Sequence, residues 1–514
     1  MLLSSCILRL GFSKRILQCA RFNSTEQVEY LKTALSNGRL DWTDVKKNIL
    51  EKRGNCNTKN IDAMMLKVMV NNKYFDAALK FADYLKKDNT DLSLGAINGL
   101  LILYYNYSKH SNLAPEEREF ILNTYNKLYE KYKILDYTTG DNLIHALCAI
   151  DEWKKCKRIL EDVKISGTPT HSAYSTIIGT LFRLNKKADA MKMIDVSVND
   201  RRPLQDYAYE EWIKSISRKY KDKKTILKYL EEICLHIENS AGPIPKVTAD
   251  RLKDAFSSLQ FETKNTEIVK KTGDCITCWQ TLDCHKLTDE EFLYLQNNVK
   301  EKLIVGSDLF LKSSPEELER FQKFVQQTAP YDIVIDALNL LYLAQKNVKD
   351  RMHILNYVVN YFSTKNMRIL VLGRKHMFKL NKGSLHYMMR RAFTFFTDDL
   401  SQDDPYFITA AILSGSHTDI LSRDLLRGHR FTLRDDNLRR IFLRWQWQHQ
   451  WKAFNSKRGP FVLTPLPYTP CAQKNSGVWH IPYESEENLD DGKINDGVPD
   501  CSTWLCLRPK PDSS

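Results

Sequence analysis

Residues 27–260 carry a helical pattern almost throughout. Apolar residues recur three and four positions apart, and prolines and glycines are few. Aligning DNLIHALCAIDEWKKCKRIL (141–160) with STIIGTLFRLNKKADAMKMI (175–194) superposes Leu147 on Leu181 and Leu160 on Ile194, an offset of 34 residues. Two helices in a unit of that length are typical of tetratricopeptide and pentatricopeptide arrays. The pattern predicts an α-helical repeat domain, and an irregular helical bundle is the alternative.

From about residue 330 to 455 the pattern changes to short apolar runs that alternate with helical stretches. The runs YDIVIDAL, MRILVLG and TDILS have the length and composition of buried strands. Between them lie VKDRMHILNYVVNYF and DPYFITAAILSG, which have helical periodicity. This alternation predicts an α/β domain with parallel strands covered by helices.

Acidic residues stand at or near the ends of these predicted strands and at a predicted helix start. Open α/β sheets place their ligand sites at the carboxyl ends of parallel strands, so these carboxylates are expected to converge. Converging carboxylates repel each other and need a cation or raised pKa values, and a divalent metal is the simpler solution. The candidates are Asp336, Asp403, Asp404 and Asp424.

Each aspartate also has an ordinary structural interpretation. Asp403 or Asp404 could cap the helix that follows Pro405, and Asp424 could cap the next segment. Asp336 is harder to explain in this way, because a charge at the end of an apolar run is costly unless it faces a site. Asn339 is a candidate to orient it by hydrogen bonding. The pair Asp398 and Asp399 has the same spacing as Asp403 and Asp404, and spacing does not separate the two pairs.

A CxxC motif lies in KTGDCITCWQTLDCHKL, where Cys275 and Cys278 supply two thiolates in a turn. A closed structural zinc site needs two further ligands, usually Cys or His. A redox role is disfavoured because no βαβ pattern surrounds the motif. The nearest candidate ligands are Cys284 and His285, and the distant candidates are His480 together with Cys506 or Cys501.

Composition and the amino-terminal segment indicate the kind of partner and the cellular compartment. The net charge of +13 and the pI near 9.0 favour a polyanionic partner. The first 25 residues contain four cations and no acid, which predicts a mitochondrial transit peptide. A secretory signal is disfavoured because basic residues interrupt its apolar stretch.

The twelve cysteines are scattered, so no disulfide scaffold is expected. No apolar run approaches the length of about eighteen residues needed for a spanning helix, so the protein is expected to be soluble, with no membrane partner.

Seven segments, in order between about 330 and 510, resemble signature segments of the protein-only ribonuclease P family and of its animal mitochondrial branch. They are IDALN, ILVLGRKHM, FFTDDLSQDDPYF, ILSGSHTDILSRDLLRGH, RWQWQHQ, GVWHIPY and TWLCLRP. The helical half resembles the pentatricopeptide domain of that family, and CITC resembles its zinc knuckle. The resemblance therefore covers nearly the whole chain after the first 25 residues.

The resemblance implies a domain plan and two metal sites. Asp336, Asp403, Asp404 and Asp424 would hold catalytic Mg²⁺ in a PIN-like (NYN) nuclease domain, and Cys275, Cys278, His480 and Cys506 would hold structural Zn²⁺. The WLC context favours Cys506 over Cys501. The expected domains are a transit peptide (1–25), a pentatricopeptide-like RNA-binding domain (27–260), a zinc-binding central domain (261–329 and 456–514) and the nuclease domain (330–455).

The function that the resemblance implies is removal of the 5′ leader of precursor tRNA in the mitochondrial matrix. Two Mg²⁺ ions would activate water for in-line hydrolysis of the phosphodiester and leave a 5′-phosphate on the mature RNA. The implied partners are a tRNA methyltransferase subunit and a short-chain dehydrogenase subunit. The competing hypotheses are a non-catalytic pentatricopeptide RNA-binding protein and another NYN or PIN-type endoribonuclease.

Overall fold

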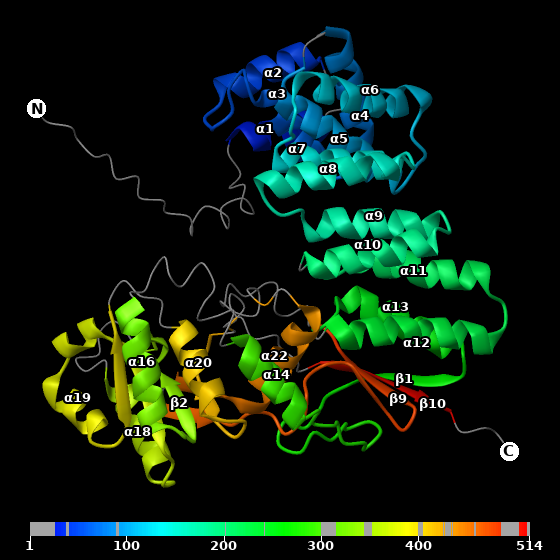
Figure 1. The fold of residues 1–514 in the computed structure, drawn as a ribbon. Coiled ribbons are helices and arrows are strands. Elements are labelled where there is room, and N and C mark those ends of the chain that lie inside the picture. The colour runs from blue at the N-terminus through cyan, green and yellow to red at the C-terminus, as the bar shows by residue number, and fades with distance from the viewer. Residues whose placement is uncertain are drawn as a thin grey trace, which may run out of the picture. The chain divides into compact units, whose positions relative to one another are not determined.

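The fold is described from a computed structural model (Figure 1). The described residues are 26–36, 41–88, 92–200, 202–240, 242–299, 315–343, 352–398, 404–424, 426, 433, 435–456, 459–484 and 503–510. The chain divides into two compact units, Met1–Ser215 and Ile216–Ser514. The transit peptide expected over 1–25 lies outside the described residues.

The described part of the first unit consists of helices arranged in consecutive pairs. The helices α3, α5, α7 and α9 pack against one another in succession, and each also packs against the helix that follows it. The helices α7, α9 and α11 begin at Tyr137, His171 and Asp206, at intervals of 34 and 35 residues, as the sequence period predicts. The helices are α1 Glu26–Ser36, α2 Trp42–Glu51, α3 Ile61–Asn71, α4 Phe75–Asp88, α5 Leu94–Ser108, α6 Pro115–Lys131, α7 Tyr137–Ala149, α8 Trp153–Ser166, α9 His171–Arg183, α10 Lys187–Asn199 and α11 Asp206–Lys219, whose last residues belong to the second unit.

Side-chain caps fix where these hairpins begin. Asp136 accepts hydrogen bonds from the amides of Thr138 and Thr139 at the start of α7. Thr170 accepts one from the amide of Ala173 at the start of α9. Such caps satisfy amides that have no partner within the helix, so the helix start is set by the sequence.

In the second unit, the last residues of α11 are followed by α12 (Lys223–Ser240) and α13 (Lys246–Ser257). This unit also contains a four-stranded antiparallel sheet. Its strands are β1 Phe261–Thr266, β8 Gln473–Asn475, β9 Val478–Pro482 and β10 Trp504–Pro509, in the order β1-β10-β9-β8. Cys506 of β10 is paired with Lys264 of β1 on one side and with His480 of β9 on the other. The last strand, β10, therefore lies beside residues 261–266 (Figure 1).

A six-stranded sheet forms the rest of this unit, in the order β4-β3-β2-β5-β6-β7. The first five of these strands are parallel, and β7 is antiparallel to β6. The strands are β2 Ile333–Asp336, β3 Ile369–Arg374, β4 Phe393–Thr397, β5 Asp419–Leu421, β6 Gln450–Ser456 and β7 Gly459–Leu463. Strand β7 adds to this sheet beyond residue 455, where the sequence pattern places the end of the nuclease domain.

Helices cover both faces of this sheet, and alternate strand residues contact opposite faces. Val334 joins a cluster with residues of α14 (Asp289–Val299), α16 (Pro315–Thr328), α20 (Asp404–Ser414) and α22 (Asp436–His449). Its neighbours Ile333 and Ile335 join a second cluster with α17 (Ala337–Leu341), α18 (His353–Ser363) and α19 (Lys382–Met389), which follows the 3-10 helix η3 (Lys375–Lys379). Burial on both faces explains why the strand segments are continuously apolar.

The structure confirms the expected fold class, a helical-repeat region with an α/β domain and a Cys/His cluster. The three strands predicted from YDIVIDAL, MRILVLG and TDILS are β2, β3 and β5. The sequence pattern did not predict β4, β6 and β7. None of the described helices is both long and apolar enough to cross a lipid bilayer.

Candidate metallonuclease centre and zinc site

Asp336 ends the central strand β2, in which all four residues are buried. Its side chain is 9% exposed and caps α17. Its Oδ1 accepts a hydrogen bond from the amide of Asn339 at 3.1 Å, and its Oδ2 accepts one from the Ser422 hydroxyl at 3.2 Å. These bonds offset part of the cost of burying a carboxylate and fix its direction at the carboxyl edge of the sheet.

Asp424 reaches the same edge from the neighbouring strand β5, which runs parallel to β2. The backbone amide of Asp424 donates to the Ser422 hydroxyl at 3.1 Å, and its Oδ1 accepts from the amide of Leu426 at 2.9 Å. Ser422 therefore links the two aspartates. Unlike Asp336, Asp424 is exposed, so its carboxylate can meet a molecule in solution.

This edge is held together by two residues outside the predicted site, Ser422 and Gln450. Gln450 is buried and donates from Nε2 to the carbonyl oxygens of Ser422 (2.7 Å) and Asp424 (2.8 Å). Asn339, expected to orient Asp336, does so through its backbone amide, whereas its side-chain oxygen accepts from the amide of Arg423 at 2.9 Å. Ser422 and Gln450 were missed because each contact joins residues that are distant in the sequence.

The other predicted aspartates are only partly described. Asp403 lies outside the described residues, and Asp404 begins α20, whose side chain at that position is not described. Helix α20 packs against β2, the strand that ends in Asp336. Of the alternative pair, Asp398 forms an ion pair with Lys375, and Asp399 lies outside the described residues.

The donor chemistry of this edge suits a hard divalent cation. Mg²⁺ prefers oxygen ligands and is commonly bound through one or two carboxylates with several waters. A carboxylate offers about four acceptor positions, so it can accept hydrogen bonds and coordinate a metal ion at the same time. The exposed carboxylate of Asp424 is accessible to such an ion from solvent.

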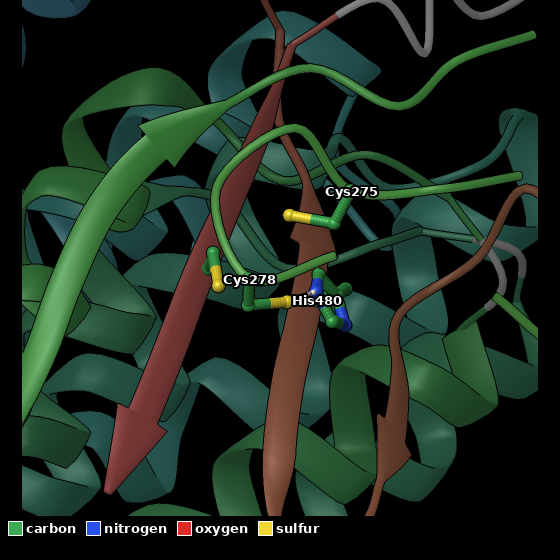
Figure 2. A group of neighbouring side chains, drawn as sticks. Cys275, Cys278 and His480 are labelled. Carbon is green, nitrogen blue, oxygen red and sulfur yellow. Dashed lines mark hydrogen bonds between the residues drawn. The ribbon is translucent and has the colours of Figure 1, made fainter. Parts of the chain in front are cut away.

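Four side chains from three segments form a second cluster in the antiparallel sheet. Cys275 and Cys278 lie on the loop after β1, His480 on β9 and Cys506 on β10 (Figure 2). Their ligand atoms all lie within 4.8 Å of one another, and Cys278 Sγ is 3.2 Å from His480 Nε2. Ligands around tetrahedral zinc, with Zn–S about 2.3 Å, are separated by roughly 3 to 4 Å. The cluster therefore has the composition and the spacing of a Cys₃His zinc site.

The thiols of this cluster have perturbed acidity. A hydrogen bond from Cys506 lowers the pKa of the Cys275 thiol far below its ordinary value, and a further bond from His480 acts in the same direction. The same contact with Cys275 raises the pKa of Cys506. Zinc binds thiolates, so a group that already favours one thiolate is suited to the ion. Thr266, which the sequence did not single out, lies 3.3 Å from Cys275 Sγ through its hydroxyl.

Two of the alternative zinc ligands, Cys284 and His285, do not join this cluster. The carbonyl of His285 accepts hydrogen bonds from Arg444 and Gln448. Cys501 lies outside the described residues.

Helical hairpins followed by a parallel α/β domain with carboxylates at its carboxyl edge define a helical-repeat protein with a nuclease-type domain. The family model for protein-only RNase P matches residues 269–506. The mitochondrial ribonuclease P catalytic subunit of Mus musculus is 32% identical over 405 residues, which are 76% of this chain and 67% of that protein. The Rattus norvegicus protein of the same name is 30% identical over 403 residues, 76% of this chain and 66% of that protein. The chain belongs to the protein-only ribonuclease P family.

A solved structure supports the same fold. The crystal structure of nuclear proteinaceous RNase P 2 from A. thaliana aligns with a TM-score of 0.53 at 16% identity, covering 88% of this chain and 100% of that chain. The chain spans about two thirds of the length of the mouse and rat relatives.

Proposed function

We propose that this protein is the catalytic subunit of a mitochondrial ribonuclease P, an endoribonuclease that removes the 5′ leader of precursor tRNA by Mg²⁺-dependent hydrolysis. Membership of the family and the names of the mouse and rat relatives support the reaction. The observation that carries the proposal is the linked pair Asp336 and Asp424 at the carboxyl edge of adjacent parallel strands.

The proposed Mg²⁺ ligands are Asp336, Asp403, Asp404 and Asp424. Mg²⁺ bound there would lower the pKa of the attacking water and stabilise the charge that develops on the leaving 3′ oxygen. The protein fixes the positions of the carboxylates. Both carboxylate oxygens of Asp336 accept hydrogen bonds, one from the amide of Asn339 and one from the hydroxyl of Ser422. Its carboxylate therefore does not need to reorganise when RNA binds. Asp424 is exposed beside it and meets the phosphodiester from solvent.

We propose a structural role for zinc on Cys275, Cys278, His480 and Cys506. The ion would tie the loop after β1 to β9 and β10, across 202 positions of sequence between Cys278 and His480. The buried apolar cluster around these residues is small, with Ile268, Leu282, Tyr468, Val478 and Trp504 as its other fully buried members. A small core of this kind gains much of its stability from a metal.

The remaining assignments complete the proposal. The helical region 27–260 would bind precursor tRNA, with residues 261–329 and 456–514 as the central domain and 330–455 as the nuclease domain, whose sheet is extended by β7. Residues 1–25 would direct the chain to the mitochondrial matrix. A tRNA methyltransferase subunit and a short-chain dehydrogenase subunit are the proposed protein partners.

Asp336→Asn tests the reaction. Asparagine is as good a helix cap as aspartate, so α17 is retained while the metal-binding charge is removed. We expect cleavage of a 5′-extended mitochondrial precursor tRNA to fall by about 100-fold or more, and EDTA to abolish wild-type cleavage. The assay follows 5′-leader release with the chain alone and with the two proposed partners.

Asp332→Asn is the matched control. Asp332 directly precedes the same strand at its opposite end, where its Oδ2 accepts from the amide of Arg368, a bond that asparagine can also accept. This variant should cleave within about threefold of wild type, because Asp332 lies at the opposite end of the strand from the proposed Mg²⁺ ligands. Wild-type protein that binds the RNA but leaves it uncut under all these conditions would contradict the proposal.

A further inference from the structure

A basic segment with no acidic residue follows strand β3. From Arg374 to Arg391 the sequence RKHMFKLNKGSLHYMMRR contains six lysines and arginines and two histidines. It forms η3 and α19, which come directly after β3. We call the exposed cations Lys375, Lys379 and Lys382 the basic strip. Arg390 and Arg391 are not part of it, because they lie just before β4, which is parallel to β3, and so lie at the opposite end of the sheet.

The basic strip begins at the edge of the sheet that carries the candidate nuclease centre. Strand β3 is parallel to β2, and Leu372 is the register partner of Asp336. The segment leaves β3 at Arg374, two residues beyond that partner. The carboxyl ends of parallel strands lie at the same end of a sheet. The first cations of the strip therefore lie at the same end of this sheet as Asp336.

Among the described residues, two of the three cations of the strip, Lys379 and Lys382, form no ion pair. Lys375 pairs with Asp398. Phe378 adds an apolar face between the cations, since it is 47% exposed and its ring lies 4.6 Å from that of Phe396. Unpaired cations beside an exposed aromatic ring are typical of surfaces that bind a nucleic acid chain.

The fold holds these cations on a defined scaffold. Leu385 and Met388 of α19 are buried in the core that covers β2 and β3. Met377 of η3 is also buried there and packs closely over Gly373, where an added Cβ would lie 2.5 Å from its sulfur. Asn381 caps α19 by accepting from the amide of Ser384. The buried residues of this segment thus anchor it to the core, and the charged side chains of the strip are exposed to solvent.

We propose that the basic strip binds the phosphate backbone of the RNA next to the scissile phosphodiester and so positions that bond over Asp336 and Asp424. The inference rests on the proposed function, because it takes the substrate to be precursor tRNA. It adds the residues that would hold the RNA chain beside the metal-binding edge. Phosphate contacts fix the register of a nucleic acid without reading its sequence, which suits an enzyme that acts on many precursors.

The test reverses two charges of the strip in the full-length chain. Lys379→Glu combined with Lys382→Glu keeps α19 stable, because glutamate at the first position of a helix is favourable. The control combines Lys270→Glu with Lys271→Glu, two exposed lysines near the zinc cluster that have no ion pair among the described residues. Both variants change the net charge equally. Lys379→Arg with Lys382→Arg retains the charge and serves as the rescue.

Binding is measured without added divalent ions, over a series of salt concentrations, with a 5′-extended precursor tRNA and with the same tRNA lacking its leader. We expect the strip variant to bind the precursor at least about tenfold more weakly than wild type near 0.1 M salt. The slope of log affinity against log salt should fall by about 1 to 2, one phosphate contact contributing roughly 0.7 to 0.9. The control should lose less than about threefold, and the arginine variant should match wild type.

Two outcomes support the inference and assign the bound segment. A loss confined to the precursor places the leader on the strip, and an equal loss for both RNAs places the tRNA end there. A strip variant that binds like the control overturns the inference even when wild-type protein cleaves precursor tRNA. A wild-type chain that binds but never cleaves overturns the proposed function alone, and one that binds neither RNA at low salt overturns both.

Discussion

Single residues at the candidate sites are held in environments that their type would ordinarily avoid. Asp336 is a charge at the end of a buried strand, and it is tolerated because both of its oxygens accept hydrogen bonds. His145 in α7 is a comparable case in the helical unit. Its ring stacks on Tyr105 at 4.6 Å, its Nδ1 lies 2.9 Å from the Thr176 hydroxyl, and its Nε2 lies 3.3 Å from the Ser172 hydroxyl.

His145 predicts a loss of stability in mild acid. Burial lowers its pKa to about 4, from an ordinary value near 6.5. Between these values the unfolded chain binds the proton and the folded chain does not, so stability falls as the pH falls through this window. The expected loss from this residue between pH 7.5 and pH 5 is about 2 kcal/mol of unfolding free energy.

His145→Gln removes the titration while keeping hydrogen-bonding capacity. Urea unfolding of the helical unit, followed by circular dichroism at pH 7.5 and pH 5, should show a smaller decrease in this variant than in wild type. An equal decrease in both proteins would mean that another group causes the acid sensitivity.

At the scale of elements, the helical unit depends on close approach between helices. Gly179 in α9 lies against Tyr207 of α11, and an added Cβ would be 2.5 Å from a ring carbon and 3.1 Å from the backbone oxygen of that residue. Gly99 in α5 and Gly140 in α7 are similarly close to Leu66 and Val163. Gly99 and Gly179 thus let neighbouring hairpins stack at short distance, and Gly140 lets the two helices of one hairpin approach closely.

Gly179→Ala should therefore destabilise the protein although alanine is the better helix former. The helix propensity favours alanine by about 1 kcal/mol, but the added Cβ would lie 2.5 Å from a ring carbon of Tyr207 and tightly against its backbone oxygen, and overpacking costs about 1 to 3 kcal/mol. Thermal unfolding should show a lower Tm for the helical unit.

Gly383→Ala is the open control, because the nearest atom to its added Cβ is Asn381 Oδ1 at 3.4 Å. This substitution in α19 should be neutral or stabilise by up to about 1 kcal/mol. A Gly179→Ala variant as stable as wild type would show that α9 and α11 separate without cost.

The sequence pattern predicted the helices and the central strands but missed other strands of the parallel sheet. The helices and the strands β2, β3 and β5 have clear periods or continuous apolar runs, and the structure has them where these patterns lie. Strand β4 is at the sheet edge with a mixed burial pattern, and β6 and β7 are half-exposed. Their composition therefore carries little of the apolar signal that marks a central strand.

At the scale of the whole molecule, the zinc cluster joins segments from the middle and the end of the chain. Cys506→Ser should remove a thiolate that no other described side chain replaces, so zinc content should fall from about one ion per chain towards zero. The unfolding transition of the second unit should fall by about 5 °C or more, and that of the helical unit should stay unchanged.

Cys284→Ser is the matched control for this prediction. Cys284 is a half-buried cysteine near the CxxC motif but outside the cluster. It should retain one zinc per chain by elemental analysis and unfold like wild type. Loss of zinc from Cys284→Ser with retention in Cys506→Ser would reverse the ligand assignment.

The sequence by itself determined the helical repeat, the parallel α/β pattern, the basic charge and the residue types of both candidate sites. These are local properties, since periodicity, strand length and side-chain chemistry are present in a short segment. Only the tertiary structure decided which distant residues meet. Strand pairing placed Ser422 and Gln450 around Asp336 and Asp424, and selected His480 and Cys506 over Cys284 and His285 as neighbours of the CxxC motif. Such contacts depend on sheet order and register, which residues far apart in the sequence fix together.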